Sequence, residues 1–345
     1  MFNVTSKMLK GAVAAAALLT ATANIASAQN LTMSSWLPPT HFGHTDFLAP
    51  YAEKIAEVTD GRVTVTILPA PLGSPPQHWE LARTGVADIT WGNFTYEPER
   101  FVTMWFSEFP NAGTNGVAQS TALWRTYEKF LKDNAAFDGV KVLGVGLLGG
   151  GHLHHGTKTI QKPEDMKNEK FRMGGPIQKQ LLEGLGAIPV AAPGPKAYEM
   201  LESGVIDGSL HPMESVVNFR VDESLKHHTI FPNGLYDASF FFIMNEAKWN
   251  SLSDEDKAAI DSISGEVMSA NWGKNFDIQS PAAVEKLTAA GNTIVEASPE
   301  LVAAVDEIYE TMVADWIVAA KAAGVEDPEA MLKFYNDTYK ELAGE

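Results

Sequence analysis

The feature that most restricts the fold of this sequence is an alternation of short, β-branched stretches with longer stretches of helical periodicity. Arg62–Leu68 (RVTVTIL) alternates as a β-strand does, and it follows 44–59, where apolar residues recur at helical spacing. Strands separated by helices pack as layers, so we expect an α/β architecture with a mainly parallel sheet. The other stretches typical of strands are 31–36, 86–91, 141–151, 171–173, 188–190, 205–209 and 236–245.

The last third of the sequence has the periodicity of helices. Ser253 precedes three acidic residues, a capping pattern that predicts a long helix after residue 253, with Ile260, Ile263 and Val267 on its buried face. Further helices are expected at 301–317 and from Asp327-Pro328 onward.

The order of these elements predicts two lobes. Lobe I comprises 29–150 plus about 236–270, and lobe II comprises 151–235 plus about 271–345 with the C-terminal helices. Strands at 141–151 and 236–245 are long enough to cross between the lobes. Two α/β lobes joined by such crossings enclose a cleft, which is where small ligands usually bind.

Residues 1–28 have the three parts of a secretory signal peptide. Lys7 and Lys10 precede an uncharged run from Gly11 to Ala23, and an Ala-x-Ala sequence ends at Ala28. The run is shorter than the roughly 20 residues that span a bilayer, and the alternative is an uncleaved amphipathic helix. We expect cleavage after about Ala28 and export, in a bacterium, to the periplasm.

Charge and composition exclude several functions. The formal net charge of −17 repels phosphate backbones, so a nucleic-acid partner is not expected. The sequence contains no cysteine, which excludes disulfides, thiolate metal sites and cysteine nucleophiles. There is also no Gly-x-x-x-x-Gly-Lys-Ser/Thr loop for a nucleotide, and no cofactor is expected.

Several blocks of the sequence together identify a family resemblance. They are 163–176 (PEDMKNEKFRMGGP), 182–190 (LEGLGAIPV), 197–208 (AYEMLESGVIDG), and 242–245 (FIMN) with Trp249. In this order and spacing they resemble the extracytoplasmic solute receptors of tripartite ATP-independent periplasmic (TRAP) transporters, the DctP-type family.

The resemblance implies a two-lobed, type II-like periplasmic binding protein fold and a receptor that is not an enzyme. Such a receptor captures a small carboxylate-containing organic solute in the cleft, closes around it, and delivers it to small DctQ-type and large DctM-type membrane subunits. A monomer is the expected state.

Arg172 is the main candidate for binding that solute, since in this family the arginine of the corresponding strand pairs with the ligand carboxylate. A guanidinium presents a planar fork of donors that matches two carboxylate oxygens, and its charge persists at any relevant pH. From the residues alone, the alternative is a surface arginine paired with one of many acidic neighbours.

The sequence departs from the family pattern near this arginine. Sialic-acid receptors of the family carry a second arginine where this chain has 149–155 (GGGHLHH), so His154 is a candidate ligand contact. His211 precedes Pro212 where many relatives have asparagine, and Gly194 stands where some have phenylalanine. These changes argue against a ligand that resembles sialic acid.

Aromatic residues supply a possible wall for the cleft. Trp36 and Trp91 end predicted strands, and further candidates are Trp79, Trp105 and Phe240. These rings could stack on an aromatic acid or enclose a cationic group. The alternative for each of them is packing in the core. Asn93 is a candidate neutral hydrogen-bond partner. The predicted ligand-binding set is therefore Arg172, Trp36, Trp91, Asn93, His154, His211, Phe240 and His41.

Two other functions stay open on the residues alone. His152, His154 and His211 offer imidazoles to a zinc ion, which would make the protein a periplasmic metal receptor, although His152 and His154 share a strand face and a long His/Asp-rich loop is missing. An exported hydrolase is the other alternative, but the sequence has neither a Gly-x-Ser-x-Gly nor a His-Glu-x-x-His motif.

Overall fold

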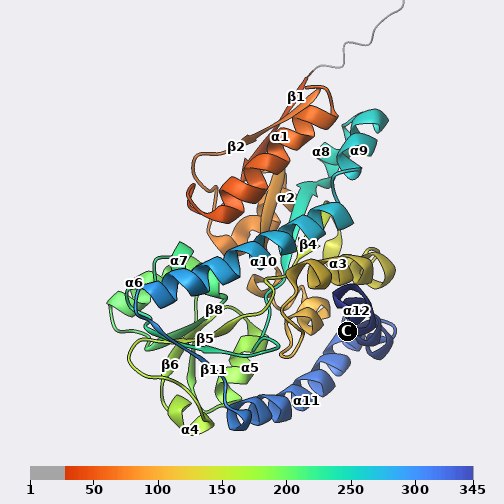
Figure 1. Ribbon diagram of the computed structural model, residues 1–345. Coiled ribbons are helices and arrows are strands. Elements are labelled where there is room, and N and C mark those ends of the chain that lie inside the picture. The colour runs from red at the N-terminus through yellow and green to blue at the C-terminus, as the bar shows by residue number, and fades with distance from the viewer. Residues whose placement is uncertain (1–27, 345) are drawn as a thin grey trace, which may run out of the picture.

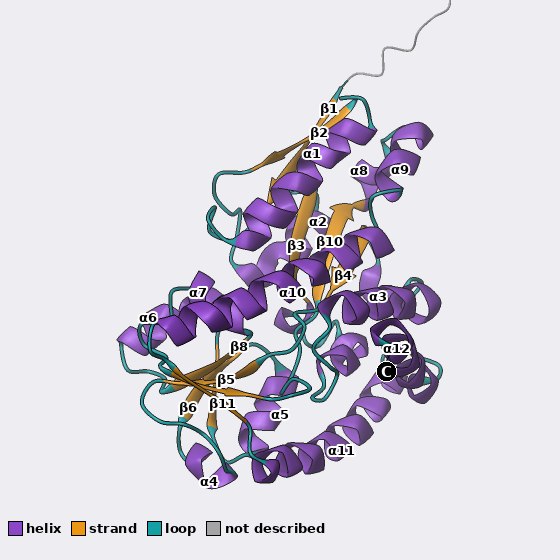
Figure 2. Cartoon of the chain, viewed as in Figure 1, coloured by secondary structure: helices purple, strands orange, loops and turns teal. Residues whose placement is uncertain are grey.

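Two β-sheets, each covered by helices, form the two halves of the protein. The computed structural model describes residues 28–344, so the predicted signal peptide lies outside the described residues apart from Ala28. The N-terminal strands lie at the top of Figure 1 and the green elements of the middle of the chain lie below them. Figure 2 shows the strands of the two halves as separate orange groups.

The upper sheet has five strands in the order β2-β1-β3-β10-β4. Four come from the first 146 residues, and β10 enters from far along the chain. The strands are β1 (Gln29–Ser34), β2 (Val63–Ile67), β3 (Ile89–Asn93), β4 (Val140–Gly146) and β10 (Phe240–Asn245). The helices of this half are α1 (Ala49–Val58), α2 (His78–Arg83), α3 (Gly116–Thr126), α8 (Glu246–Asn250) and α9 (Asp254–Asp261).

The lower sheet has six strands in the order β11-β9-β5-β8-β6-β7. They are β5 (His152–His155), β6 (Lys170–Met173), β7 (Ile188–Ala191), β8 (Gly208–His211), β9 (His227–Ile230) and β11 (Thr293–Glu296). The helices that follow these strands are α4 (Pro163–Met166), α5 (Pro176–Gly184), α6 (Ala197–Glu202) and α7 (Met213–Asn218).

The two-lobed α/β architecture is confirmed, and both sheets are mainly parallel, but each contains one antiparallel strand that was not predicted. β10 runs antiparallel to β3 and β4, and β5 runs antiparallel to β8 and β9. The cause is the path of the chain: β4 leaves the upper sheet, β5 begins the lower one, and β10 returns upward between two strands already in place. Local periodicity carries no information about that return.

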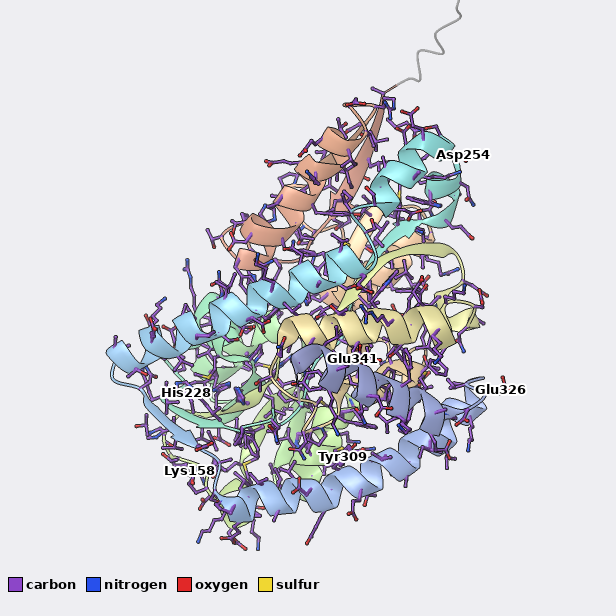
Figure 3. All side chains as sticks on the ribbon, turned by 45° about the vertical axis from the view of Figure 1, so that its right-hand side comes forward. Lys158, His228, Asp254, Tyr309, Glu326 and Glu341 are labelled. Atoms are coloured by element: carbon purple, nitrogen blue, oxygen red, sulfur yellow. The ribbon has the colours of Figure 1, made fainter. Side chains whose placement is uncertain are left out.

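A single long helix, α10 (Glu266–Ala289), spans both halves (Figures 1 and 3). Its 24 residues correspond to roughly 36 Å at the rise of an α-helix. It packs on α3 and β4 above and on α7 below. Gly265, with φ of +62°, separates α10 from α9 and turns Val267 outward. Val267 is 58% exposed, so its predicted burial was wrong.

The C-terminal helices α11 (Pro299–Ala322) and α12 (Pro328–Ala343) begin where the sequence predicts. The side chains of Ser253, Ser298 and Asp327 each accept a hydrogen bond from a backbone N–H three residues on, at α9, α11 and α12. α11 packs on α5 and on the 3-10 segment Val102–Glu108, and α12 packs on α3. The predicted lobe boundaries stay a prediction.

Strand ends were predicted less well than strand positions. β3 begins at Ile89 rather than Val86, β4 ends at Gly146 rather than Gly151, and β10 begins at Phe240 rather than Tyr236. The residues left over at 147–151 and 236–239 belong to two extended segments that cross between the sheets and meet in a bridge of Gly151 with Tyr236. The strands β9 and β11 were not predicted.

Among residues 28–344, no helix combines the length and the apolar character needed to cross a bilayer.

Candidate functional site

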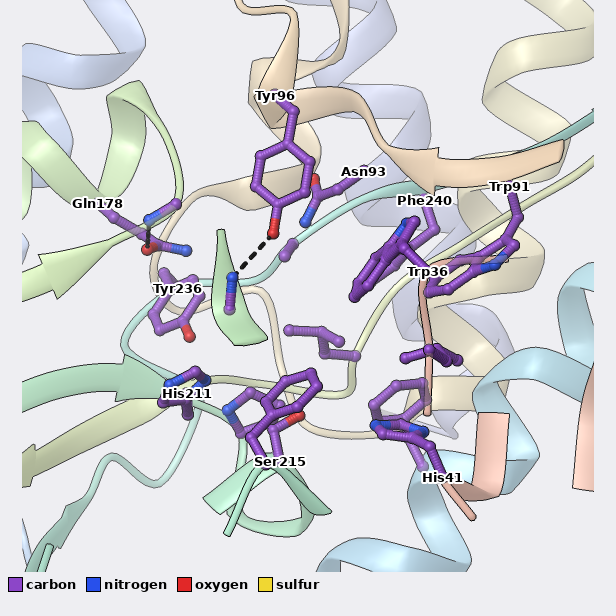
Figure 4. A pocket seen from close by; sticks show the side chains of 18 of the residues that line it. Trp36, His41, Trp91, Asn93, Tyr96, Gln178, His211, Ser215, Tyr236 and Phe240 are labelled. Atoms are coloured by element: carbon purple, nitrogen blue, oxygen red, sulfur yellow. Dashed lines mark hydrogen bonds between the residues drawn. The ribbon is translucent and has the colours of Figure 1, made fainter. Parts of the chain in front are cut away.

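A cavity lies between the two sheets, and side chains from both halves line it (Figure 4). Its volume is about 60 Å³. The residues from the upper half are Trp36, Leu37, His41, Trp91, Asn93 and Tyr96. Those from the lower half are Arg172, Gly174, Gln178, Gly194, His211, Pro212, Ser215 and Phe219. The crossing segments, β10 and α10 add Leu148, Tyr236, Ala238, Phe240, Trp272 and Phe276.

Arg172 enters this cavity from β6, a strand paired on both sides. β7 and β8 flank β6, and the ends of these neighbours hold the guanidinium. Nε donates to the carbonyl oxygen of Ala192 at 2.8 Å, and Nη1 donates to that of Leu210 at 3.0 Å. The side chain is therefore fixed, and the third nitrogen, Nη2, is left to the cavity.

Arg172 is a buried cation without an acidic partner. Its residue is 5% exposed, and within residues 28–344 no carboxylate lies within ion-pair distance of its guanidinium. A buried charge without a counter-ion is costly unless a partner completes it. Because Arg172 is the one Lys or Arg side chain that lines the cavity, the site suits a ligand with a single negative charge.

The histidines of the cavity do not add to that charge. Burial, with a smaller contribution from the nearby charge of His44, lowers the pKa of His41 to about 4. Burial and the Arg172 charge hold the pKa of His211 well below its usual range. Both imidazoles are therefore neutral at pH 7, and the second also faces the cavity beside Arg172.

Two amide side chains present donors to the cavity. Asn93 Oδ1 accepts a hydrogen bond from the Thr95 N–H at 3.0 Å, and Gln178 Oε1 accepts one from the Gly174 N–H at 2.6 Å. Because each oxygen is held by a backbone donor, each NH₂ group is free to face the other way. Figure 4 shows Gln178 on the same side of the cavity as Tyr236, and Asn93 nearer to Phe240.

Aromatic rings form the opposite side of the cavity. Trp36 stacks on Trp91 with ring centroids 4.4 Å apart, and Trp91 in turn stacks on Phe240 at 5.8 Å. Trp272 packs against Phe240 at 5.1 Å. In Figure 4, Trp36, Trp91 and Phe240 lie across the cavity from Gln178 and His211. The cavity is thus cationic and rich in donors at one end and aromatic at the other.

The two halves touch each other around this cavity, so the structure is a closed one. Tyr96 follows β3 in the upper half, and its hydroxyl accepts a hydrogen bond at 3.1 Å from the N–H of Gly194, which follows β7 in the lower half. The ring centroid of His41 in the upper half lies 5.3 Å from that of Phe219, the residue that follows α7. These contacts join the two halves beside the cavity.

Seven of the eight predicted ligand-binding residues line this single cavity: Arg172, Trp36, Trp91, Asn93, His211, Phe240 and His41. His154 does not line it. Its Nε2 donates to the carbonyl oxygen of His211 and its Nδ1 lies 2.8 Å from that of His228, so it ties β5 to its two neighbours. The alternation of a strand turns this side chain into the layer below the cavity.

Among the further aromatic candidates, Trp79 and Trp105 lie outside the cavity lining. Trp79 is fully buried among Phe94, Phe101 and Phe241. Sequence reasoning missed seven lining residues with polar or aromatic side chains, namely Tyr96, Gln178, Ser215, Phe219, Tyr236, Trp272 and Phe276. Most of them lie in helices or crossing segments, where periodicity gives no sign of which face meets the other half.

The zinc alternative finds no geometric support. In the part of the chain that the structure describes, no group of three or more His, Asp or Glu side chains is placed to hold a metal ion. His152, His154 and His211 lie on neighbouring strands, but His154 is engaged by His228 and by a backbone carbonyl.

Comparison with known proteins points to one family. Residues 33–318 match the model of the bacterial extracellular solute-binding proteins, family 7, known as DctP. That match covers every strand except the first residues of β1, and it includes all the residues that line the cavity.

Three solved structures are similar over nearly the whole chain. A TRAP periplasmic solute-binding protein from Bordetella bronchiseptica with bound (R)- and (S)-mandelate is 35% identical, with a TM-score of 0.87, over 91% of this chain and 99% of that one. A marine metagenome TRAP protein specific for aromatic acids, with 3-hydroxybenzoate, is 32% identical, with a TM-score of 0.85, over 90% and 98%. A Rhodoferax ferrireducens TRAP protein with copurified benzoate is 26% identical, with a TM-score of 0.86, over 91% and 98%.

Proposed function

This chain belongs to family 7 of the bacterial extracellular solute-binding proteins, and we propose that its ligand is a small aromatic monocarboxylate. It is a solute receptor of a TRAP transporter and not an enzyme, and its relatives capture carboxylates. The proposal concerns which carboxylate this receptor takes.

One observation carries the proposal: a buried Arg172 without an acidic partner faces a small cavity between the two halves, and the opposite wall of this cavity is aromatic. The free edge of the guanidinium suits one carboxylate. The stacked Trp36 and Trp91, with Phe240, suit a flat apolar ring, which gains free energy from burial and from ring contacts. A ligand with both parts would meet both walls of the cavity.

The ligands of similar receptors support this proposal. Mandelate, 3-hydroxybenzoate and benzoate, found in the three structures above, each combine one carboxylate with one aromatic ring. A uronate or dicarboxylate would instead bring several hydroxyls or a second charge to the aromatic wall. Desolvating those groups without partners costs binding free energy.

Binding and delivery would follow from the arrangement of the two halves. Arg172 fixes the anion on the lower half, and closure by a hinge at the crossing segments brings the aromatic wall over it. The closed, loaded receptor then docks on DctQ-type and DctM-type membrane subunits. We place the mature protein in the periplasm, with the signal peptide removed after about Ala28.

A ligand screen tests the proposal. We expect benzoate, mandelate or 3-hydroxybenzoate to raise the unfolding midpoint of the purified mature protein by mass action and to be recovered unchanged. Native mass spectrometry should also detect an aromatic acid carried through purification. Stabilisation by uronates or C4-dicarboxylates, with none by any aromatic monocarboxylate, would contradict the proposal.

A further inference from the structure

Gln178 is a buried polar residue whose orientation is fixed. It lies in the first turn of α5, is 3% exposed, and folds back so that its Oε1 accepts a hydrogen bond from the Gly174 N–H at 2.6 Å. A backbone N–H is a donor, so the side-chain atom that faces it has to be the oxygen. The NH₂ group of Gln178 therefore points away from the loop.

That NH₂ group borders the free edge of Arg172. Gln178 lines the cavity, and within the described residues its Nε2 has no hydrogen-bond partner. Gly174, which lies between the two side chains, leaves a small space. A Cβ placed on Gly174 would lie 3.2 Å from Arg172 Nη2 and 3.7 Å from Gln178 Nε2. Two donors from different side chains thus lie close to the same position, the one that a Gly174 Cβ would take.

Arg172 by itself leaves a bound carboxylate incompletely paired. Its Nε and Nη1 already donate to the carbonyl oxygens of Ala192 and Leu210, so its bidentate fork is partly used within the protein. A carboxylate has two oxygens, and each one that is buried without a donor costs free energy. A second donor beside Nη2 supplies what the partly used fork lacks.

We propose that Gln178 is a specificity-determining residue of this receptor, whose NH₂ group donates to the second oxygen of the ligand carboxylate. The inference rests on the proposed function and adds the second half of its anion site. Gln178 selects for a carboxylate because its oxygen is held by Gly174, so only its donor side meets the ligand.

Gln178→Glu is the sharpest test, because it keeps an oxygen for the Gly174 N–H and replaces the donor by a second oxygen. At pH 8 we expect the calorimetric Kd for benzoate, mandelate or 3-hydroxybenzoate, whichever binds the wild type most tightly, to rise roughly 100-fold or more. As the pH falls to 5.5, the introduced carboxyl takes up a proton and donates, so the affinity recovers. Gln178→Leu should weaken binding roughly 10-fold at either pH.

Gln180→Glu is the matched control. Gln180 lies on the same helix, is half-buried, and is outside the cavity lining, so the same change of charge there should leave Kd within about twofold of the wild-type value. Circular dichroism confirms that each variant is folded.

The outcomes separate the two proposals. Wild-type Kd values for both Gln178 variants, or a Gln178→Glu defect that does not change with pH, overturn the role of Gln178 and leave the aromatic-acid receptor standing. Failure of the wild-type protein to bind any of the three acids overturns the proposed function itself.

Discussion

At the scale of single residues, the hydrogen bonds that side chains make within the protein determine which of their donor atoms are left to bind a ligand. Arg172 was predictable because it stands in a block, FRMGGP, whose resemblance carries a role. Gln178 was not, since PIQKQLLEG is an ordinary amphipathic helix in which any polar residue fits the solvent face. The proposed role of Gln178 depends on a turn of the chain that brings the Gly174 N–H to the Gln178 side-chain oxygen. A pattern of residue types does not predict that turn.

Gly174→Ala tests the space between the two donors. The added methyl would lie 3.2 Å from Arg172 Nη2, where a carboxylate oxygen is expected, so Kd for an aromatic acid should rise roughly 10-fold. The unfolding midpoint of the ligand-free protein should change by only a few degrees. Unchanged affinity would show that the carboxylate lies elsewhere.

At the scale of elements, the cavity is built from strand ends and the loops that follow them. β6 positions Arg172 and β3 positions Trp91 and Asn93, and both strands were predicted to within a few residues. The 3-10 turn after β3 (Phe94–Tyr96) and the turn after β7 (Gly194–Lys196) were not predicted, because short irregular segments lack periodicity. These are the segments that meet across the edge of the cavity.

Tyr96→Phe removes the hydrogen bond between those segments and should speed ligand release. A net hydrogen bond of about 0.5–1.5 kcal/mol corresponds to a roughly 2–10-fold faster dissociation rate, with little change in association. Stopped-flow tryptophan fluorescence measures both rates. Tyr198→Phe, on the exposed face of α6, is the control, and equal dissociation rates for all three proteins would argue against a closing role for Tyr96.

At the scale of the whole molecule, two crossing segments and the helix α10 hold the halves together. Helical and strand periodicity predicted two α/β lobes and crossings near 141–151 and 236–245, but not the mixed pairing or the reach of α10 over both sheets. Pairing partners far apart in sequence are set by the path of the chain, and local patterns do not contain that path. Buried carboxylates, Glu108 and Asp237, lie where the crossing segments meet the upper half.

Glu108→Gln tests these buried carboxylates through the pH dependence of stability. Burial, with a smaller contribution from the nearby charge of Asp237, raises the pKa of Glu108 to about 7, although hydrogen bonds from Ser239 oppose the shift. A raised folded pKa means that the contribution of Glu108 is complete below about pH 4.5 and is lost as the pH rises toward 7, by on the order of 2–3 kcal/mol. The unfolding midpoint of the variant, relative to that of the wild type, should therefore rise between pH 5 and pH 8. A constant difference across that range would contradict the assignment.

The most direct test of the account is isothermal titration calorimetry of Arg172→Ala and Arg172→Lys with the aromatic acid that the wild-type protein binds. Loss of one partner of a buried ion pair should weaken binding by ~2–5 kcal/mol, which is a roughly 30- to 5,000-fold rise in Kd, and lysine should restore only part of it because the planar fork is gone. A Kd for Arg172→Ala equal to that of the wild type would contradict the claim that this guanidinium holds the ligand.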